Sequence, residues 1–210
     1  MELPFTVDQF MAVFAAYNVA VWPAQILLYA VALLAVLLPF SKVARDGWIA
    51  TVLGFLWLWM GIAYHWLHFA SINKAAYAFG ALFVLQGLLF LFAGQRGQLL
   101  FQRPNGLRGV LGIALLLYAL IIYPMLGAAM GHVYPNAPSF GLPCPTTIFT
   151  LGLLFCTTGK VPWWILAIPL LWSLIGFMAA IKLGIREDIG LLVAGAMAAV
   201  FLLRPVKAAS

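Results

Sequence analysis

Long apolar runs, each closed by charged residues or helix breakers, constrain this chain more than any other feature. A membrane-spanning helix needs about 20 mainly apolar residues, because the hydrocarbon core is about 30 Å thick. The runs are continuous rather than alternating, which excludes a transmembrane barrel, and lipid offers backbone groups no partner, so the runs must be helical. Seven segments qualify, near residues 20–40, 48–69, 75–93, 108–130, 146–158, 162–182 and 188–204.

Composition places the chain in the same class. Hydrophobic residues make up 66% of it and charged residues 8%, against about 45–50% and about 25% in ordinary globular proteins. So few charges cannot cover a water-soluble domain, which excludes a soluble enzyme or a nucleic-acid-binding protein. We therefore expect one all-α polytopic domain over residues 1–210, with the lipid bilayer as its first partner.

Basic residues predict the orientation, because they collect on the cytoplasmic side. The fifth segment has only about 13 residues between a proline and a glycine, so it either crosses or dips in and returns. Crossing divides the basic residues 8 to 3 between the sides, whereas dipping divides them 7 to 4. Seven spans are favoured, with the N-terminus outside and the C-terminus inside. The expected inner residues are Lys42, Arg45, Arg96, Arg103, Arg108, Lys160, Arg204 and Lys207, and the outer ones are Lys74, Lys182 and Arg186.

A short helix is expected before the first span. Thr6 and Gln9 have the spacing of a capping box, and Phe10, Phe14 and Tyr17 follow on one helix face. The segment lacks the basic start of a signal peptide. We expect it to lie along the membrane interface.

Absent features narrow the function. Proton-driven transporters usually carry carboxylates within the membrane, and none of the acidic residues lies well inside a predicted span. The last span lacks the lysine that a retinal protein needs. Cys144 and Cys156 would be roughly 18 Å apart along a helix, too far for a disulfide. The acidic residues are Glu2, Asp8, Asp46, Glu187 and Asp188.

The predicted topology brings all three histidines to the outer end. His65 and His68 share one helix face near the end of the second span, and His132 begins the connection after the fourth. That connection, residues 131–145, holds four prolines and no charged residue. We therefore expect an ordered plug over a pocket that opens outward.

A helix start is predicted beneath this plug. Proline suits the first turn of a helix, and Thr146 and Thr147 can cap the free N–H groups. A helix start below the outer surface would present unpaired donors to a ligand and anchor an anionic or neutral solute. Amide side chains on the same side complete the candidate ligand-binding set, namely Asn18, Gln25 and Asn73.

Several functions remain open on these residues. The pocket predicts binding or translocation of a small solute or ion. Alternatively, imidazole and thiol groups suit copper, zinc or haem iron. A thiol enzyme using Cys144, and a scaffold or sensor without chemistry, are further alternatives. The metal-ligand set would be His65, His68, His132 and Cys144.

Three runs of sequence resemble a known family. They are Ala15 to Gln25, His65 to Asn73, and Phe140 to Thr150. Together they are similar to an uncharacterised family of bacterial multi-pass inner-membrane proteins, known only as a domain of unknown function. The resemblance implies a bacterial inner membrane, with the outer side facing the periplasm. It implies no activity, cofactor or catalytic residue.

Overall fold

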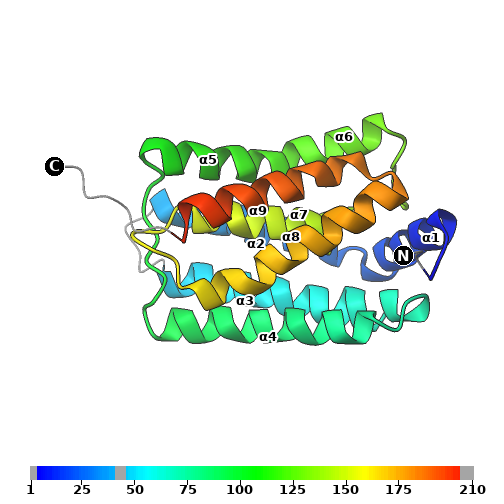
Figure 1. Ribbon diagram of the computed structural model, residues 1–210, viewed down its shortest axis with the longest axis horizontal. Helices are drawn as coiled ribbons and strands as arrows, with labels where there is room; N and C mark the ends of the chain where they lie inside the picture. Colours follow the sequence, from blue (N-terminus) through cyan, green and yellow to red (C-terminus); the bar gives the residue numbers. More distant parts are fainter. Residues whose placement is uncertain (1–3, 41–45, 204–210) are drawn as a thin grey trace.

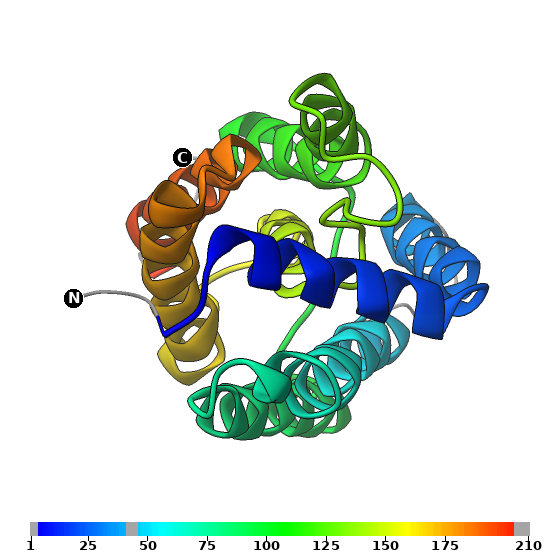
Figure 2. The ribbon, with the colours of Figure 1, turned by 90° about the vertical axis from the view of Figure 1, so that its right-hand side faces the viewer.

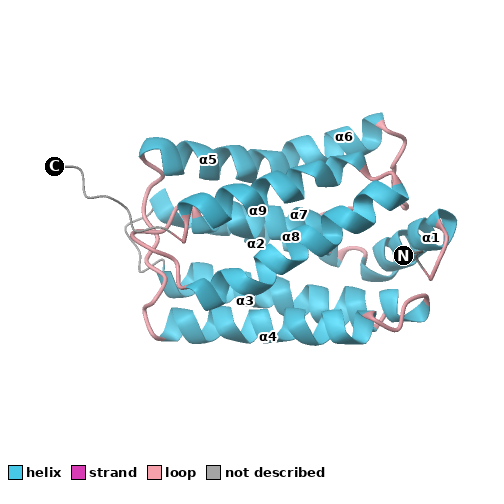
Figure 3. Ribbon diagram, viewed as in Figure 1, coloured by secondary structure: helices cyan, strands magenta, loops and turns pink. Residues whose placement is uncertain are grey.

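The computed structural model describes residues 4–40 and 46–203, and this part of the chain is mainly helical (Figures 1 and 3). It contains no β-strand, only two isolated β-bridges. The expectation of an all-α chain is confirmed. The α-helices are α1 (Val7–Val21), α2 (Ala24–Leu37), α3 (Asp46–Trp59), α4 (Ala76–Gln95), α5 (Gly106–Leu117), α6 (Tyr123–Ala129), α7 (Pro143–Leu154), α8 (Trp163–Leu183) and α9 (Ile189–Phe201).

Short segments of other helix types join several of these helices. Two π-helical segments continue long helices, η2 (Met60–Trp66) after α3 and η4 (Tyr118–Ile122) between α5 and α6. Such wide turns often occur near functional sites. The 3₁₀ segments are η1 (Leu38–Phe40), η3 (Phe69–Ser71) and η5 (Arg186–Asp188).

Helix α7 forms the centre of the bundle. Figure 2 shows it enclosed by a ring of α2, α3, α4, α5, α6, α8 and α9. Every α7 residue except Cys144 is buried. A helix that is buried on all sides must be apolar on all sides or satisfy its polar groups internally. One such contact is the 3.0 Å hydrogen bond that Trp57 Nε1 donates to Thr150 Oγ1.

Helix length bears on the number of membrane crossings. Four helical segments of the described chain are long and apolar enough to span: 46–71, 76–95, 106–129 and 163–183. A fifth arises if α1 and α2, which meet at 86°, count as one span. The expected seven spans are not confirmed, because α7 and α9 have only 12 and 13 residues. The last residues expected inside, from 204 onward, and those at 41–45 lie outside the described part.

Helix α1 lies across one end of the bundle, in front of α7 in Figure 2. The predicted capping box is confirmed: Thr6 Oγ1 accepts from Gln9 N, and Thr6 N donates to Gln9 Oε1. The predicted apolar face, Phe10, Phe14 and Tyr17, is buried against the bundle. The short N-terminal helix is therefore present and packs its aromatic face over this end, which we call the α1 end.

The opposite end is closed by two short extended segments. Gln102 N donates to Cys156 O at 2.9 Å, and Thr158 N donates to Leu100 O at 2.7 Å. Asp46 at the start of α3 accepts from Phe101 N at 2.6 Å. These bonds join the connection before α5 to the connection after α7, so the bundle is tied together away from the α1 end.

Gly141 shapes the entry into α7. Its φ of +97° lies in the region that favours glycine. A Cβ atom there would lie 2.5 Å from Leu28 Cδ1. The Gly141 carbonyl accepts a hydrogen bond from Tyr17 Oη at 3.2 Å. This position joins α1, α2 and the start of α7.

We expect Gly141→Ala to destabilise the protein more than a positive φ alone explains. A left-handed backbone costs a non-glycine residue about 1–2 kcal/mol, and the contact with Leu28 adds to that cost. The measurement is the thermal unfolding midpoint in detergent. Gly159→Ala is the matched control, because Gly159 has φ +72° and a Cβ atom added there would meet nothing within 4 Å. Equal losses in the two variants would contradict the assignment.

Candidate functional site

A cavity of about 500 Å³ lies at the α1 end, between α1, the start of α7 and α8. Pro143, Cys144 and Pro145 form the wall contributed by α7. Pro138 and Leu142 of the proline-rich connection also border it. Its volume falls within the range of about 300–1,000 Å³ typical of small-molecule sites.

Aromatic rings form about a third of the lining. Eight aromatic side chains border the cavity, and α1 supplies two of them, Phe10 and Phe14. Phe10 stacks edge-on against Phe69 with centroids 5.7 Å apart. Tyr64, at the end of η2, is stacked on Phe69 at 5.6 Å. The full aromatic set is Phe5, Phe10, Phe14, Tyr64, Phe69, Phe79, Tyr123 and Trp172.

One wall of the cavity is polar. Asp188, only 4% exposed, accepts a 2.6 Å hydrogen bond from Tyr123 Oη, and the Cys144 thiol lies beside this carboxylate. Trp172 Nε1 is buried without a hydrogen-bond partner of good geometry and lies beside the weakly accepting Cys144 sulfur. Asp188 is therefore a buried carboxylate whose direct contacts are a phenol and a thiol.

Burial changes the acidity of this carboxylate, which lies in the connection between α8 and α9 and outside the four long apolar helices. Removal from water raises the pKa of Asp188 above its usual value, because the charged form loses hydration. The hydrogen bonds from Tyr123 and Cys144 lower it in part, since they stabilise the charged form. Among the described residues, Asp188 is thus the carboxylic acid that borders the cavity.

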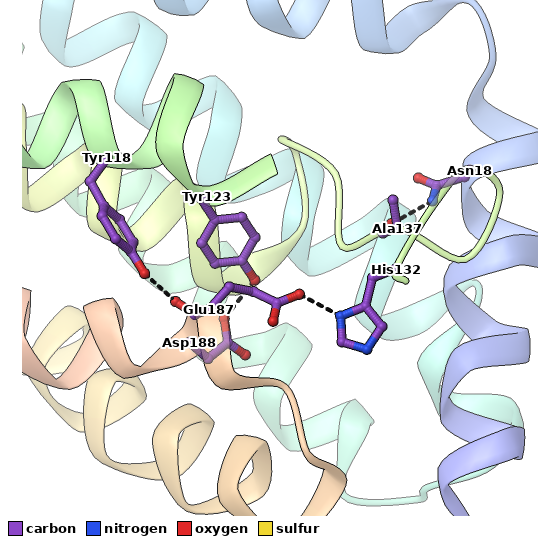
Figure 4. A network of polar contacts seen from close by, with 7 residues as sticks. All are labelled: Asn18, Tyr118, Tyr123, His132, Ala137, Glu187 and Asp188. Atoms are coloured by element: carbon purple, nitrogen blue, oxygen red, sulfur yellow. Dashed lines mark hydrogen bonds and ion pairs between the residues drawn. The ribbon is translucent and has the colours of Figure 1, made fainter. Parts of the chain in front are cut away.

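A second buried carboxylate, Glu187, precedes Asp188 in the sequence and does not border the cavity. Glu187 is completely buried, and its Oε1 lies 2.7 Å from His132 Nδ1 (Figure 4). Tyr118 Oη donates to the Glu187 carbonyl at 2.6 Å. A Cβ atom at Gly127 would lie 3.2 Å from Glu187 Oε1, so the absence of a side chain there leaves room for the pair. His132 pairs with a carboxylate and does not border the cavity.

The other two predicted histidines also lie outside the cavity lining. His65 is fully buried, its two ring nitrogens have no hydrogen-bond partner, and aromatic rings surround it. Phe83, Tyr64 and Trp172 are the nearest of these rings, with centroids 4.6, 5.1 and 5.2 Å away. His68 Nδ1 bonds to the Ala63 carbonyl at 2.6 Å. All three histidines are at the α1 end as predicted, but their side chains do not converge.

A metal site on these residues is not supported by the described chain. Within residues 4–40 and 46–203, no group of three or more histidine, cysteine, aspartate and glutamate side chains could hold a metal ion. The physical reason is that His65 is enclosed by rings, whereas His132 bonds to Glu187. The structure therefore does not assemble the predicted ligand set His65, His68, His132 and Cys144.

The predicted amide ligands hold the proline-rich connection in place. Asn18 Nδ2 donates to the Pro135 carbonyl at 2.6 Å. It also donates to the Ala137 carbonyl at 2.7 Å (Figure 4). Asn18 Oδ1 accepts from Gln25 Nε2 at 2.7 Å and from Ser139 Oγ at 2.6 Å. Asn18 and Gln25 thus fix the connection to α1 and α2. Their polar atoms are used inside the protein.

The start of α7 does not present the free N–H groups that would bind an anionic ligand. Thr146 Oγ1 accepts from Gly141 N at 3.0 Å, and both Thr146 and Thr147 are fully buried. The two prolines of the first turn have no N–H, and Asp188 lies beside the Cys144 thiol between them. A carboxylate already faces this helix end. Of the predicted amide residues, Asn73 borders the cavity.

The acidic pair and Tyr123 are site residues that the sequence alone does not indicate. Glu187 and Asp188 lie between two apolar segments, where the sequence predicts only a connection. One signal was available: two adjacent acids stand in a chain that has only five. The folding of the connection against α6 and α7 buries them, and no local pattern predicts that contact.

Comparison with known proteins gives a family match. A family model matches residues 7–209, and its description is "Family of unknown function (DUF6064)". No curated protein and no solved structure matches the chain. The resemblance to a family of unknown function is therefore confirmed over nearly the whole sequence.

We expect His65→Leu to leave stability unchanged or to increase it. Replacing an unpartnered buried polar group by an apolar one removes a desolvation penalty. Thr150→Val is the contrasting variant, because it leaves the buried Trp57 N–H unpaired and should cost about 1–3 kcal/mol. The measurement is thermal unfolding in detergent. A larger loss for His65→Leu than for Thr150→Val would show that the imidazole has a partner in the native protein.

We expect His132→Leu to destabilise the α1 end by up to about 3 kcal/mol, the low end of the range for buried pairs. The variant leaves Glu187 buried without its partner, although His132 is itself 17% exposed and so partly screened. The measurement is a double-mutant cycle with Glu187→Gln by thermal unfolding. Additive losses from the two changes would contradict a direct interaction.

Proposed function

The chain belongs to the DUF6064 family, whose function is unknown, and we propose that it is a multi-pass membrane protein that binds a small, largely apolar molecule. The binding site is the cavity at the α1 end. The observation that carries the proposal is the combination of aromatic lining with one polar wall, formed by Asp188, Tyr123 and Cys144. Apolar pockets with a few convergent polar groups are the usual form of small-molecule sites.

We further propose that the α1 end faces the periplasm of a bacterial inner membrane. The family resemblance supports the location, and the distribution of basic residues supports the orientation. The connections before α5 and α8, which carry Arg103 and Lys160, lie at the end opposite α1, at the left in Figure 1. Basic residues favour the cytoplasmic side.

Translocation of the ligand is a second candidate function, and the short central helix favours it. Helix α7 is about 18 Å long at about 1.5 Å per residue, and non-helical backbone precedes it. Interrupted helices near the middle of the membrane recur at the binding sites of transporters. Flux of a bound compound into liposomes would support transport, whereas binding without flux would support a receptor or carrier role.

We expect the cavity to bind the neutral fluorescent probe N-phenyl-1-naphthylamine. Ala179→Phe should reduce binding several-fold, because residue 179 borders the cavity and a ring would occupy part of it. Ala128→Phe is the matched control, since Ala128 is exposed on α6. The measurement is probe fluorescence with the purified protein in an uncharged detergent. Equal binding by both variants and the native protein would place the probe outside the cavity.

A further inference from the structure

We propose that the cavity selects ligands with a positively charged, apolar-substituted group, such as a quaternary ammonium, bound beside Asp188. This inference rests on the proposed function and names the chemical class of its ligand. It depends on three observations: the placement of a carboxylate in the wall, the charge balance around it, and the aromatic rings that complete the cavity.

The first observation is the position of the Asp188 carboxylate in the cavity wall. Asp188 borders the cavity, is 4% exposed, accepts a hydrogen bond from Tyr123 and lies beside the Cys144 thiol. Neither group carries a positive charge. A buried anion without a cationic contact is costly. A cation placed in the cavity would supply that contact.

The second observation is that two acidic side chains lie close to one basic side chain, which also favours a cationic ligand. Glu187 is buried next in sequence, and the nearby His132 bonds to Glu187 at 2.7 Å. One imidazolium can neutralise one of the two adjacent carboxylates. A second positive charge is needed when both are ionised. Without a ligand, a proton bound to Asp188 removes the second negative charge. A bound cationic ligand balances that charge instead.

The aromatic lining suits such a group. Ring faces attract cations, and cages of aromatic side chains recognise quaternary ammonium groups. Tyr123 and Trp172 border the cavity and contact Asp188 or its thiol partner Cys144, while Tyr64 and Phe79 border the same space. The remaining rings, two from α1, one from the residues before it and one from η3, offer an apolar surface for the rest of the molecule.

The alternative ligand class, an anionic amphiphile bound by Lys182, has weaker support. Lys182 also borders the cavity, but its side chain is exposed and therefore at the rim. Water screens an exposed charge far more than a buried one. The buried carboxylate therefore has the stronger influence on what enters.

Three probes of equal chain length test the charge preference: octyltrimethylammonium, octanol and octanesulfonate. Each competes with N-phenyl-1-naphthylamine on the purified full chain in an uncharged detergent. We expect the cation to displace the probe at about tenfold lower concentration than the other two. Asp188→Asn should remove this preference and leave competition by octanol intact. Asp8→Asn, which removes an exposed carboxylate on α1, should keep it.

A pH series on the native protein provides a test that needs no variant. Protonation of Asp188 removes the attraction, so lowering the pH through its raised pKa should weaken competition by the cation and leave octanol unchanged. The titratable groups acting on Asp188 are Tyr64, Tyr118, Tyr123, His132, Cys144 and Glu187, with Lys182 at the rim.

The outcomes separate the inference from the proposed function. Equal competition by all three probes would overturn the charge preference while leaving the cavity as a binding site. Strongest competition by octanesulfonate, lost in Lys182→Ala, would replace it with an anionic ligand. Failure of N-phenyl-1-naphthylamine to bind at all would overturn the proposed function itself.

Discussion

Backbone carbonyl groups above a buried helix need hydrogen-bond donors, and this requirement organises the α1 end. The connection at 131–142 runs over the start of α7 and contains two prolines, Pro135 and Pro138, which supply no N–H of their own. Asn18 donates to two of its carbonyls, and Tyr17 donates to Gly141. Without these donors the connection would leave unpaired groups in an apolar surrounding, where each is costly. The bond network therefore fixes α1 across the bundle, and the cavity exists because α1 is held there.

Much of the fold followed from the sequence, because its signals are local. Apolar runs predicted the helices, and a threonine–glutamine spacing predicted the capping box that α1 contains. The number of crossings did not follow in the same way. Helix α7 has 12 residues and is enclosed by other helices, so it needs no contact with lipid along its length. Apolar composition cannot distinguish a helix buried in protein from one that faces lipid.

Prolines and a short apolar segment suggested a pocket above α7. The cavity borders the start of α7, and of the residues expected at a site, Asn73 and Cys144 line it. The histidines appeared to be its natural polar groups, since imidazoles are frequent in functional sites. The direction of the side chains gives the cavity different polar groups. His65 lies among aromatic rings, while the turn between α8 and α9 brings Asp188 to the cavity. Which side of a helix faces a cavity depends on packing between distant segments, and a single sequence does not contain that information.

The two halves of α1 are attached to the bundle by different interactions, hydrogen bonds in one half and aromatic ring contacts in the other. This difference determines which half a ligand can displace on entry. The C-terminal half is fixed by the hydrogen bonds of Tyr17 and Asn18. The N-terminal half contributes ring contacts, such as that between Phe10 and Phe69. A polar contact that opens in an apolar surrounding leaves unpaired groups, whereas a ring contact can be exchanged for the apolar surface of a ligand at little cost. The N-terminal half of α1 is therefore the part of the cavity wall that a largely apolar ligand can displace, while the hydrogen bonds around Asn18 keep the helix attached.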